Sequence, residues 1–137
     1  MENEQNTNQP TEQGSKLAKV LVVEDDKFLR DLLVRKLKEE NFEIETAIDG
    51  VEAIKKADEW MPNLILLDLI IPGLDGFEVL KQLKENPNTN KIPTVILSNL
   101  GQQEEIQKGM GLGASDYLVK AHLTPGEIID KVKGLLE

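Results

Sequence analysis

The chain has 137 residues, which suits one domain with one core, and its formal net charge is −9. No basic stripe lies on any predicted element, which argues against direct nucleic-acid binding, and without cysteine there is no disulfide framework or thiolate metal site. No apolar stretch approaches the roughly 20 residues of a membrane span, and no signal-peptide core is present. We therefore expect a soluble cytoplasmic protein with no membrane insertion.

The first 16 residues hold almost no apolar side chains and are rich in Asn, Gln, Glu and Thr. Such a segment cannot bury enough surface to offset the entropy lost on ordering. We expect a disordered tail over residues 1–16 and one domain over residues 17–137. Because the last predicted helix ends close to Glu137, we expect no second domain.

From Lys19 onward, short apolar runs alternate with amphipathic stretches. The apolar runs predict strands over residues 19–23, 43–47, 64–68, 94–98 and 116–119. The stretches between and after them predict helices over residues 27–40, 50–59, 76–86, 103–110 and 125–136. Three of the strand runs, the first, third and fourth, are nearly continuous in Val, Ile and Leu, as expected for strands covered on both faces.

Two of the helices carry informative detail. The first should present one apolar stripe, made of Leu29, Leu33 and Leu37 with Phe28 and Leu32 beside them. The fourth is short, polar and rich in glycine, so we expect an element that can shift at little cost.

Five strand-helix units in sequence predict an α/β fold. We expect a doubly wound five-stranded parallel sheet in the flavodoxin-like order 2-1-3-4-5, with helices on both faces. In open parallel sheets, ligands bind at the carboxyl ends of strands where the winding direction reverses, which here lies between the first and third strands.

Those two strands both end in acids: Glu24 and Asp25 follow the first, and Asp68 ends the third. Without a cation, mutual repulsion should raise the pKa of at least one carboxyl group. Mg²⁺ would replace the repulsion with ligation, because it prefers hard oxygen ligands. Asp68 could then act as a nucleophile toward a phosphoryl group and form an acyl phosphate.

Two more strand ends carry polar groups that suit this chemistry. The hydroxyl of Ser98 could donate to a phosphoryl oxygen, and the ammonium of Lys120 could pair first with the carboxylate and later with phosphate. Singly, a serine there is usually a turn residue and a lysine is usually solvated. Together with the acids they form a strong signal.

The complete set resembles a response-regulator receiver domain, the phosphoacceptor module of two-component signalling, and is most similar to the stand-alone, chemotaxis-type regulators. The resemblance covers about residues 19–136. It is carried by Glu24-Asp25-Asp26, by the run 68–76 (DLIIPGLDG), by Ser98, and by the run 117–120 (YLVK).

The resemblance implies that Asp68 is the phosphorylation site. It implies that Asp25 and Asp68 ligate Mg²⁺ directly, that the backbone carbonyl of Ile70 is a third ligand, and that Glu24 acts mainly through a metal-bound water.

The resemblance also implies the parts of a conformational switch. Ser98 and Lys120 would bind the phosphoryl group, together with the backbone N–H of Asn99. Tyr117 would turn inward as Ser98 moves, and the weak fourth helix would lie on the output face.

One departure from the family concerns Ala121, which stands where receivers usually have a proline after a cis peptide. A cis bond before alanine would cost about 2.5–4 kcal/mol, so we expect a trans bond. In the family, the positions of Ile70 and Leu100 tune the lifetime of the phosphoryl group. Two apolar side chains cannot orient an attacking water, which predicts slow self-dephosphorylation.

The leading hypothesis is a switch that accepts phosphate on Asp68 from a histidine kinase or phosphotransfer protein and controls an unknown downstream protein, with phosphorylation-dependent dimerisation left open. Because it would modify only itself, we do not expect an enzyme in the usual sense. One alternative is a pseudo-receiver that binds a partner without phosphorylation. Another is a metal-dependent phosphatase, which typically carries a second acid where Ile70 stands.

Overall fold

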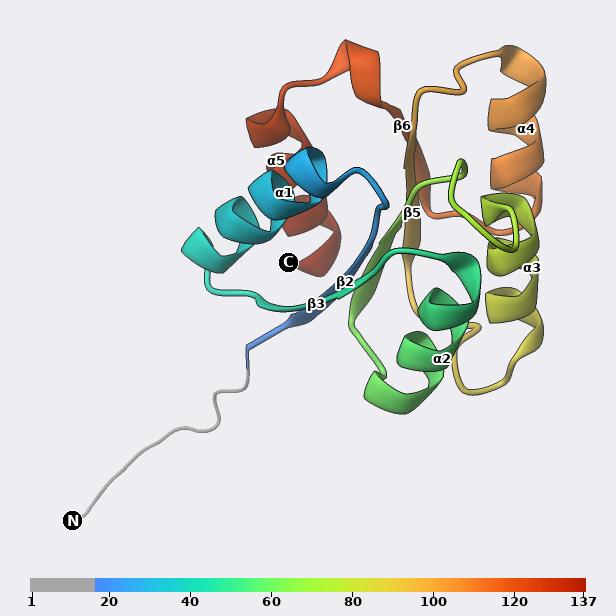
Figure 1. Cartoon of the computed structure of the whole chain (residues 1–137), viewed down its shortest axis with the longest axis horizontal. Coiled ribbons are helices and arrows are strands. Elements are labelled where there is room, and N and C mark those ends of the chain that lie inside the picture. The colour runs from blue at the N-terminus through green and yellow to red at the C-terminus, as the bar shows by residue number, and fades with distance from the viewer. Residues whose placement is uncertain (1–16) are drawn as a thin grey trace.

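A five-stranded parallel sheet forms the centre of the protein, seen in a computed structural model that describes residues 17–137 (Figure 1). The predicted tail, residues 1–16, lies outside the described residues. The strand order is β3-β2-β4-β5-β6, and every neighbouring pair is parallel. The strands are β2 (Lys19–Val23), β3 (Glu43–Ala47), β4 (Leu64–Leu67), β5 (Thr94–Ser98) and β6 (Asp116–Val119). Numbered along the chain this is the order 2-1-3-4-5, so the predicted fold class is confirmed.

Helices cover both faces of the sheet (Figure 1). On one face lie α1 (Lys27–Glu39) and α5 (Pro125–Leu136). On the other lie α2 (Gly50–Trp60), α3 (Gly76–Glu85) and α4 (Gln103–Gly111). None of the helices within residues 17–137 is long and apolar enough to cross a membrane.

Each face of the sheet has its own core, because successive strand residues point to opposite sides. One core is built around α1 and α5 and contains Val20, Val22, Leu33, Leu37, Leu64, Leu66, Val95, Leu97, Leu118, Ile128, Ile129 and Val132. The other is built around α2 and α3 and includes Leu21, Val23, Ala53, Ala57, Ile65, Leu67, Val79, Leu80, Leu83 and Ile96. Strands with two buried faces explain the nearly continuous Val, Ile and Leu runs.

Side-chain caps fix where the helices begin. The carboxylates of Asp26, Asp49 and Asp75 accept hydrogen bonds from backbone N–H groups in the first turns of α1, α2 and α3. Thr124 and Glu127 form a reciprocal capping box at the start of α5.

The predicted boundaries were wrong by one residue at five element ends. Strand β4 ends at Leu67, so Asp68 lies just beyond it. Helix α3 ends at Glu85, because Pro87 forces Asn86 into extended backbone. Helix α1 also ends one residue earlier than predicted, at Glu39, whereas α2 and α4 each run one residue longer.

The apolar stripe on α1 also needs a correction. Leu33 and Leu37 are fully buried, but Phe28 is 81% exposed. Phe28 lies five residues before Leu33, roughly 140° around the helix, so it cannot share the face that meets the sheet. The prediction that Phe28 extends this stripe was therefore wrong.

The segment after β6 forms a short 3₁₀ turn, Lys120–His122, which the sequence analysis did not predict. There are no cis peptide bonds in the part of the chain that the structure describes. The bond before Ala121 is therefore trans, as expected. Lys120, the first residue of this turn, follows β6 at the carboxyl edge of the sheet.

Candidate functional site

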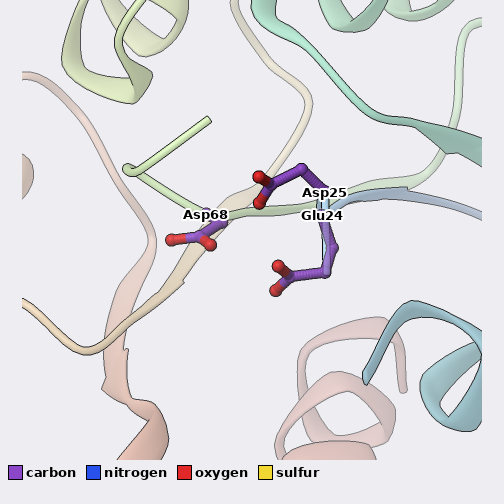
Figure 2. Close-up of side chains that lie close together, drawn as sticks. All are labelled: Glu24, Asp25 and Asp68. Carbon is purple, nitrogen blue, oxygen red and sulfur yellow. The ribbon is translucent and has the colours of Figure 1, made fainter. Parts of the chain in front are cut away.

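Three carboxylates converge at the carboxyl edge of the sheet, where β2 and β4 lie side by side (Figure 2). Glu24 and Asp25 follow β2, and Asp68 follows β4. One oxygen of each carboxylate lies within 4.8 Å of the others. Glu24 and Asp68 are buried, at 2% and 5% exposure, whereas Asp25 is open to solvent. The structure thus brings together the three acids that the sequence placed at one crevice.

Lys120 joins the two buried acids. Its ammonium lies 2.9 Å from Oδ2 of Asp68 and 2.7 Å from Oε1 of Glu24. The pairing with Asp68 was expected, but the pairing with Glu24 was not. One cation from β6 therefore partly neutralises acids from two other strands.

Burial and neighbouring charges shift the pKa values of Glu24 and Lys120. Burial raises the pKa of Glu24, and the hydrogen bond from Lys120 lowers it. The negative charge of Asp68 raises the pKa further, so the net pKa of Glu24 is raised. Burial alone would lower the pKa of Lys120, but its hydrogen bonds to Glu24 and Asp68 outweigh burial and the net pKa is raised. The ammonium therefore stays protonated across the physiological range.

The donor set fits a hard divalent cation. Three carboxylates offer oxygen ligands at one place, and Asp25 stands at the solvent side, where a hydrated ion can enter. Magnesium prefers such oxygen ligands and keeps several waters. Glu24, Asp25 and Asp68 could therefore hold Mg²⁺ between them.

The turn after Asp68 is shaped by close backbone contacts. The N–H of Ile70 donates to Oδ1 of Asp68 at 3.2 Å, which orients the carboxylate. A Cβ on Gly76 would lie 2.4 Å from Cα of Leu69 and 2.7 Å from the carbonyl oxygen of Asp68. Only glycine can therefore bring the start of α3 against the turn that carries Asp68.

Ser98 lies at the end of β5, the strand next to β4, and is fully buried. Its Oγ accepts a hydrogen bond from the N–H of Leu100 at 3.4 Å. The carbonyl oxygen of Leu100 in turn accepts a hydrogen bond from the hydroxyl of Tyr117. The backbone of Leu100 thus links Ser98 to the ring on β6. Asn99, between them, is exposed.

Sequence reasoning missed Arg30, whose Nη1 donates to the carbonyl oxygens of Glu24 and Asp25 at 3.0 and 3.2 Å. Its partners are backbone carbonyl groups, which every residue has, so no sequence motif marks the contact. Only the position of Arg30, one turn into α1, could have indicated it.

Known proteins resemble this chain in sequence and in fold. A family model described as the response regulator receiver domain matches residues 20–133. The phosphate regulon transcriptional regulatory protein PhoB of Rhizobium meliloti is 38% identical over 120 residues, covering 88% of this chain and 52% of that protein. The chain spans about half the length, or less, of the first curated relatives it matches.

Two solved structures are similar over nearly the whole described chain. The chemotaxis protein CheY4 of Vibrio cholerae has a TM-score of 0.80 at 30% identity, covering 87% of this chain and 98% of that one. The Mn²⁺-bound form of response regulator Rcp1 has a TM-score of 0.72 at 31% identity, covering 86% of this chain and 91% of that one.

Proposed function

Because this chain belongs to the response regulator receiver domain family, we propose that it is a phosphorylation-controlled switch of a two-component system. Asp68 accepts a phosphoryl group from a histidine kinase or phosphotransfer protein, and the modified protein controls a downstream partner. The observation that carries this proposal is the buried carboxylate of Asp68, paired with Lys120 beside two further acids. We assign the switch to residues 17–137 as one domain.

The chemistry of the transfer follows from these contacts. An oxygen of Asp68 forms a bond to phosphorus while the phosphorus–nitrogen bond of the donor histidine breaks, and the donor nitrogen keeps the electron pair. The ammonium of Lys120, 2.9 Å from Oδ2, is placed to exchange its carboxylate partner for a phosphoryl oxygen. Such transfers depend mainly on positioning and charge neutralisation, which these residues supply.

We propose that the site holds Mg²⁺. Asp25 and Asp68 would hold the ion directly, together with the backbone carbonyl of Ile70, and Glu24 would contribute through water. The convergence of three carboxylates supports this assignment, as does the similarity to a receiver solved with Mn²⁺. When bound, the ion supplies positive charge that offsets the negative charge gathering on the phosphoryl oxygens.

The output side of the switch involves Ser98 and Tyr117. We propose that Ser98 and the N–H of Asn99 bind the phosphoryl group, and that movement of Ser98 is passed on through the backbone of Leu100. The existing hydrogen bonds from Leu100 to Ser98 and from Tyr117 to Leu100 support such a path. The resulting change biases the surface of α4, β6 and α5, where the downstream protein binds.

The protein would be modified on its own Asp68 and would not release a product with each cycle. A small acyl phosphate with Mg²⁺ tests this directly by intact mass. We expect the mass gain of one phosphoryl group in the wild type and none in Asp68→Asn or with a chelator. Asp31→Asn, an exposed acid on α1, is the matched control and should react like the wild type.

A wild type that gains no mass would instead favour the pseudo-receiver alternative. Modification that persists in Asp68→Asn would place the phosphoryl group elsewhere. Continuous release of product from a phosphoester substrate would favour the phosphatase alternative.

A further inference from the structure

The three acids of the loop between β2 and α1 are held in different ways. The carboxylate of Glu24 is fixed by Lys120 and by the N–H of Asp26, which donates to Oε2 at 3.1 Å. The carboxylate of Asp26 is fixed as the cap of α1, accepting from the N–H of Leu29 at 3.2 Å. Each of these two groups has a direct partner that sets its direction.

Asp25 has no such partner. Within residues 17–137, no hydrogen bond or ion pair reaches its carboxylate, and the residue is exposed. A short side chain without a partner populates the staggered rotamers that its backbone dihedral angles allow, so the backbone determines where those rotamers place the carboxylate. The direction of the Asp25 carboxylate therefore depends on how firmly its own peptide units are held.

Arg30 holds those peptide units. A single nitrogen, Nη1, donates to the carbonyl oxygens of both Glu24 and Asp25, at 3.0 and 3.2 Å. The backbone N–H of the same residue donates to the carbonyl of Asp26 at 2.9 Å. That last bond is the first backbone hydrogen bond of α1 and does not depend on the side chain, whereas the guanidinium ties the carbonyl groups of Glu24 and Asp25 to the first turn of the helix.

We propose that Arg30 is a positioning residue for the magnesium site. By fixing the peptide units of Glu24 and Asp25, Arg30 keeps the carboxylate of Asp25, which has no partner of its own, close to the carboxylate of Asp68, where the ion would bind. Mg²⁺ demands near-ideal octahedral geometry, so a small displacement of one ligand lowers affinity. Groups that orient ligands typically change metal affinity by 10–100-fold when removed. The inference rests on the proposed metal site but not on phosphoryl transfer.

Whether Arg30→Met binds Mg²⁺ more weakly or more tightly than the wild type separates a positioning role from a role through charge. A positive guanidinium near a cation site repels the incoming ion, so a role through charge alone predicts that Arg30→Met binds Mg²⁺ more tightly. A positioning role predicts the opposite. Lys27 offers the matched control, because it is a cation on the same helix whose ammonium pairs with exposed Asp31 at 2.6 Å and touches no loop carbonyl.

Calorimetric titration with Mg²⁺ alone tests the proposal on the full chain, with no phosphodonor present. We expect binding about tenfold weaker in Arg30→Met. Lys27→Met should be unchanged or slightly tighter, within about twofold, because exposed charges are screened. Arg30→Lys keeps a charge that can reach only part of this arrangement, so its affinity should fall between those of wild type and Arg30→Met.

Unfolding measured in a chelator separates a merely structural role. If Arg30 only stabilises the loop, Arg30→Met lowers the stability of the metal-free protein while the folded fraction binds Mg²⁺ as tightly as wild type, which overturns the proposal. Equal or tighter binding in any folded Arg30 variant overturns it too. If Arg30→Met does not fold, Arg30→Lys decides by the same criterion. A wild type that does not bind Mg²⁺ would instead refute the metal site of the proposed function.

Discussion

Replacing the glycines near the end of α4 one at a time by alanine tests how closely this helix is seated on the sheet. A Cβ on Gly109 would lie 2.6 Å from Cδ1 of Ile96 and 3.0 and 3.2 Å from Cδ2 and Cε2 of Tyr117. A Cβ on Gly111 would meet nothing within 4 Å. Both residues belong to the same helix, so the pair differs mainly in what the added methyl group touches.

The expected magnitudes follow from two opposing effects. Alanine gains about 0.5–1 kcal/mol over glycine in a helix, because it loses less backbone entropy on folding. At Gly109 this gain is opposed by overpacking, which costs about 1–3 kcal/mol in a close-packed core. Ile96 is fully buried, so its methyl group has little room to yield. Gly111→Ala should therefore be more stable than wild type, and Gly109→Ala less stable than Gly111→Ala by about 1–3 kcal/mol.

Chemical denaturation of the three proteins measures these differences. A second readout comes from Tyr117, the only tyrosine in the sequence, because fluorotyrosine labelling gives a single ¹⁹F resonance. That resonance should move in Gly109→Ala and stay in place in Gly111→Ala. Equal stabilisation by both substitutions, with an unmoved resonance, would refute the close seating of α4 over Tyr117.

Two further predictions concern the surroundings of the phosphoacceptor. Burial, and then nearby carboxylates, raise the pKa of Tyr117 above its ordinary 10.0, so phenolate absorbance should titrate above that value. Since the folded state keeps this proton longer than the unfolded state, the free energy of unfolding should fall as the pH rises past 10.0, and Tyr117→Phe should remove that part of the slope. The double substitution Ile70→Asn and Leu100→Glu should shorten the lifetime of the acyl phosphate several-fold, because polar side chains at these two positions can orient an attacking water. An unchanged decay would reject our hypothesis of slow self-dephosphorylation.

Much of the fold could be predicted because its signals are local. Strands buried on both faces must be apolar throughout, which made β2, β4 and β5 recognisable without any tertiary information. The position of the acids followed from topology, since the carboxyl ends of adjacent parallel strands meet at one edge. Lys120 follows β6 at the same edge, with only β5 between it and β4, so its pairing with Asp68 could be predicted too.

The features that escaped prediction depend on helix phase or on backbone acceptors. Phe28 belongs to an apolar cluster in sequence, yet the rotation of α1 turns it to solvent. The bonds from Arg30 to loop carbonyls, and from Tyr117 to the carbonyl of Leu100, use acceptors that every residue possesses. The second partner of Lys120, Glu24, was missed because it follows β2, which both β4 and β5 separate from β6 in the sheet.

The double ion pair of Lys120 affects whether the protein needs a bound metal ion in order to fold. In many small metalloproteins the metal provides the folding energy, and the chain collapses when a chelator removes it. Here the ammonium of Lys120 already offsets part of the negative charge of both buried acids from within the polypeptide. We therefore expect the metal-free chain to stay folded in a chelator.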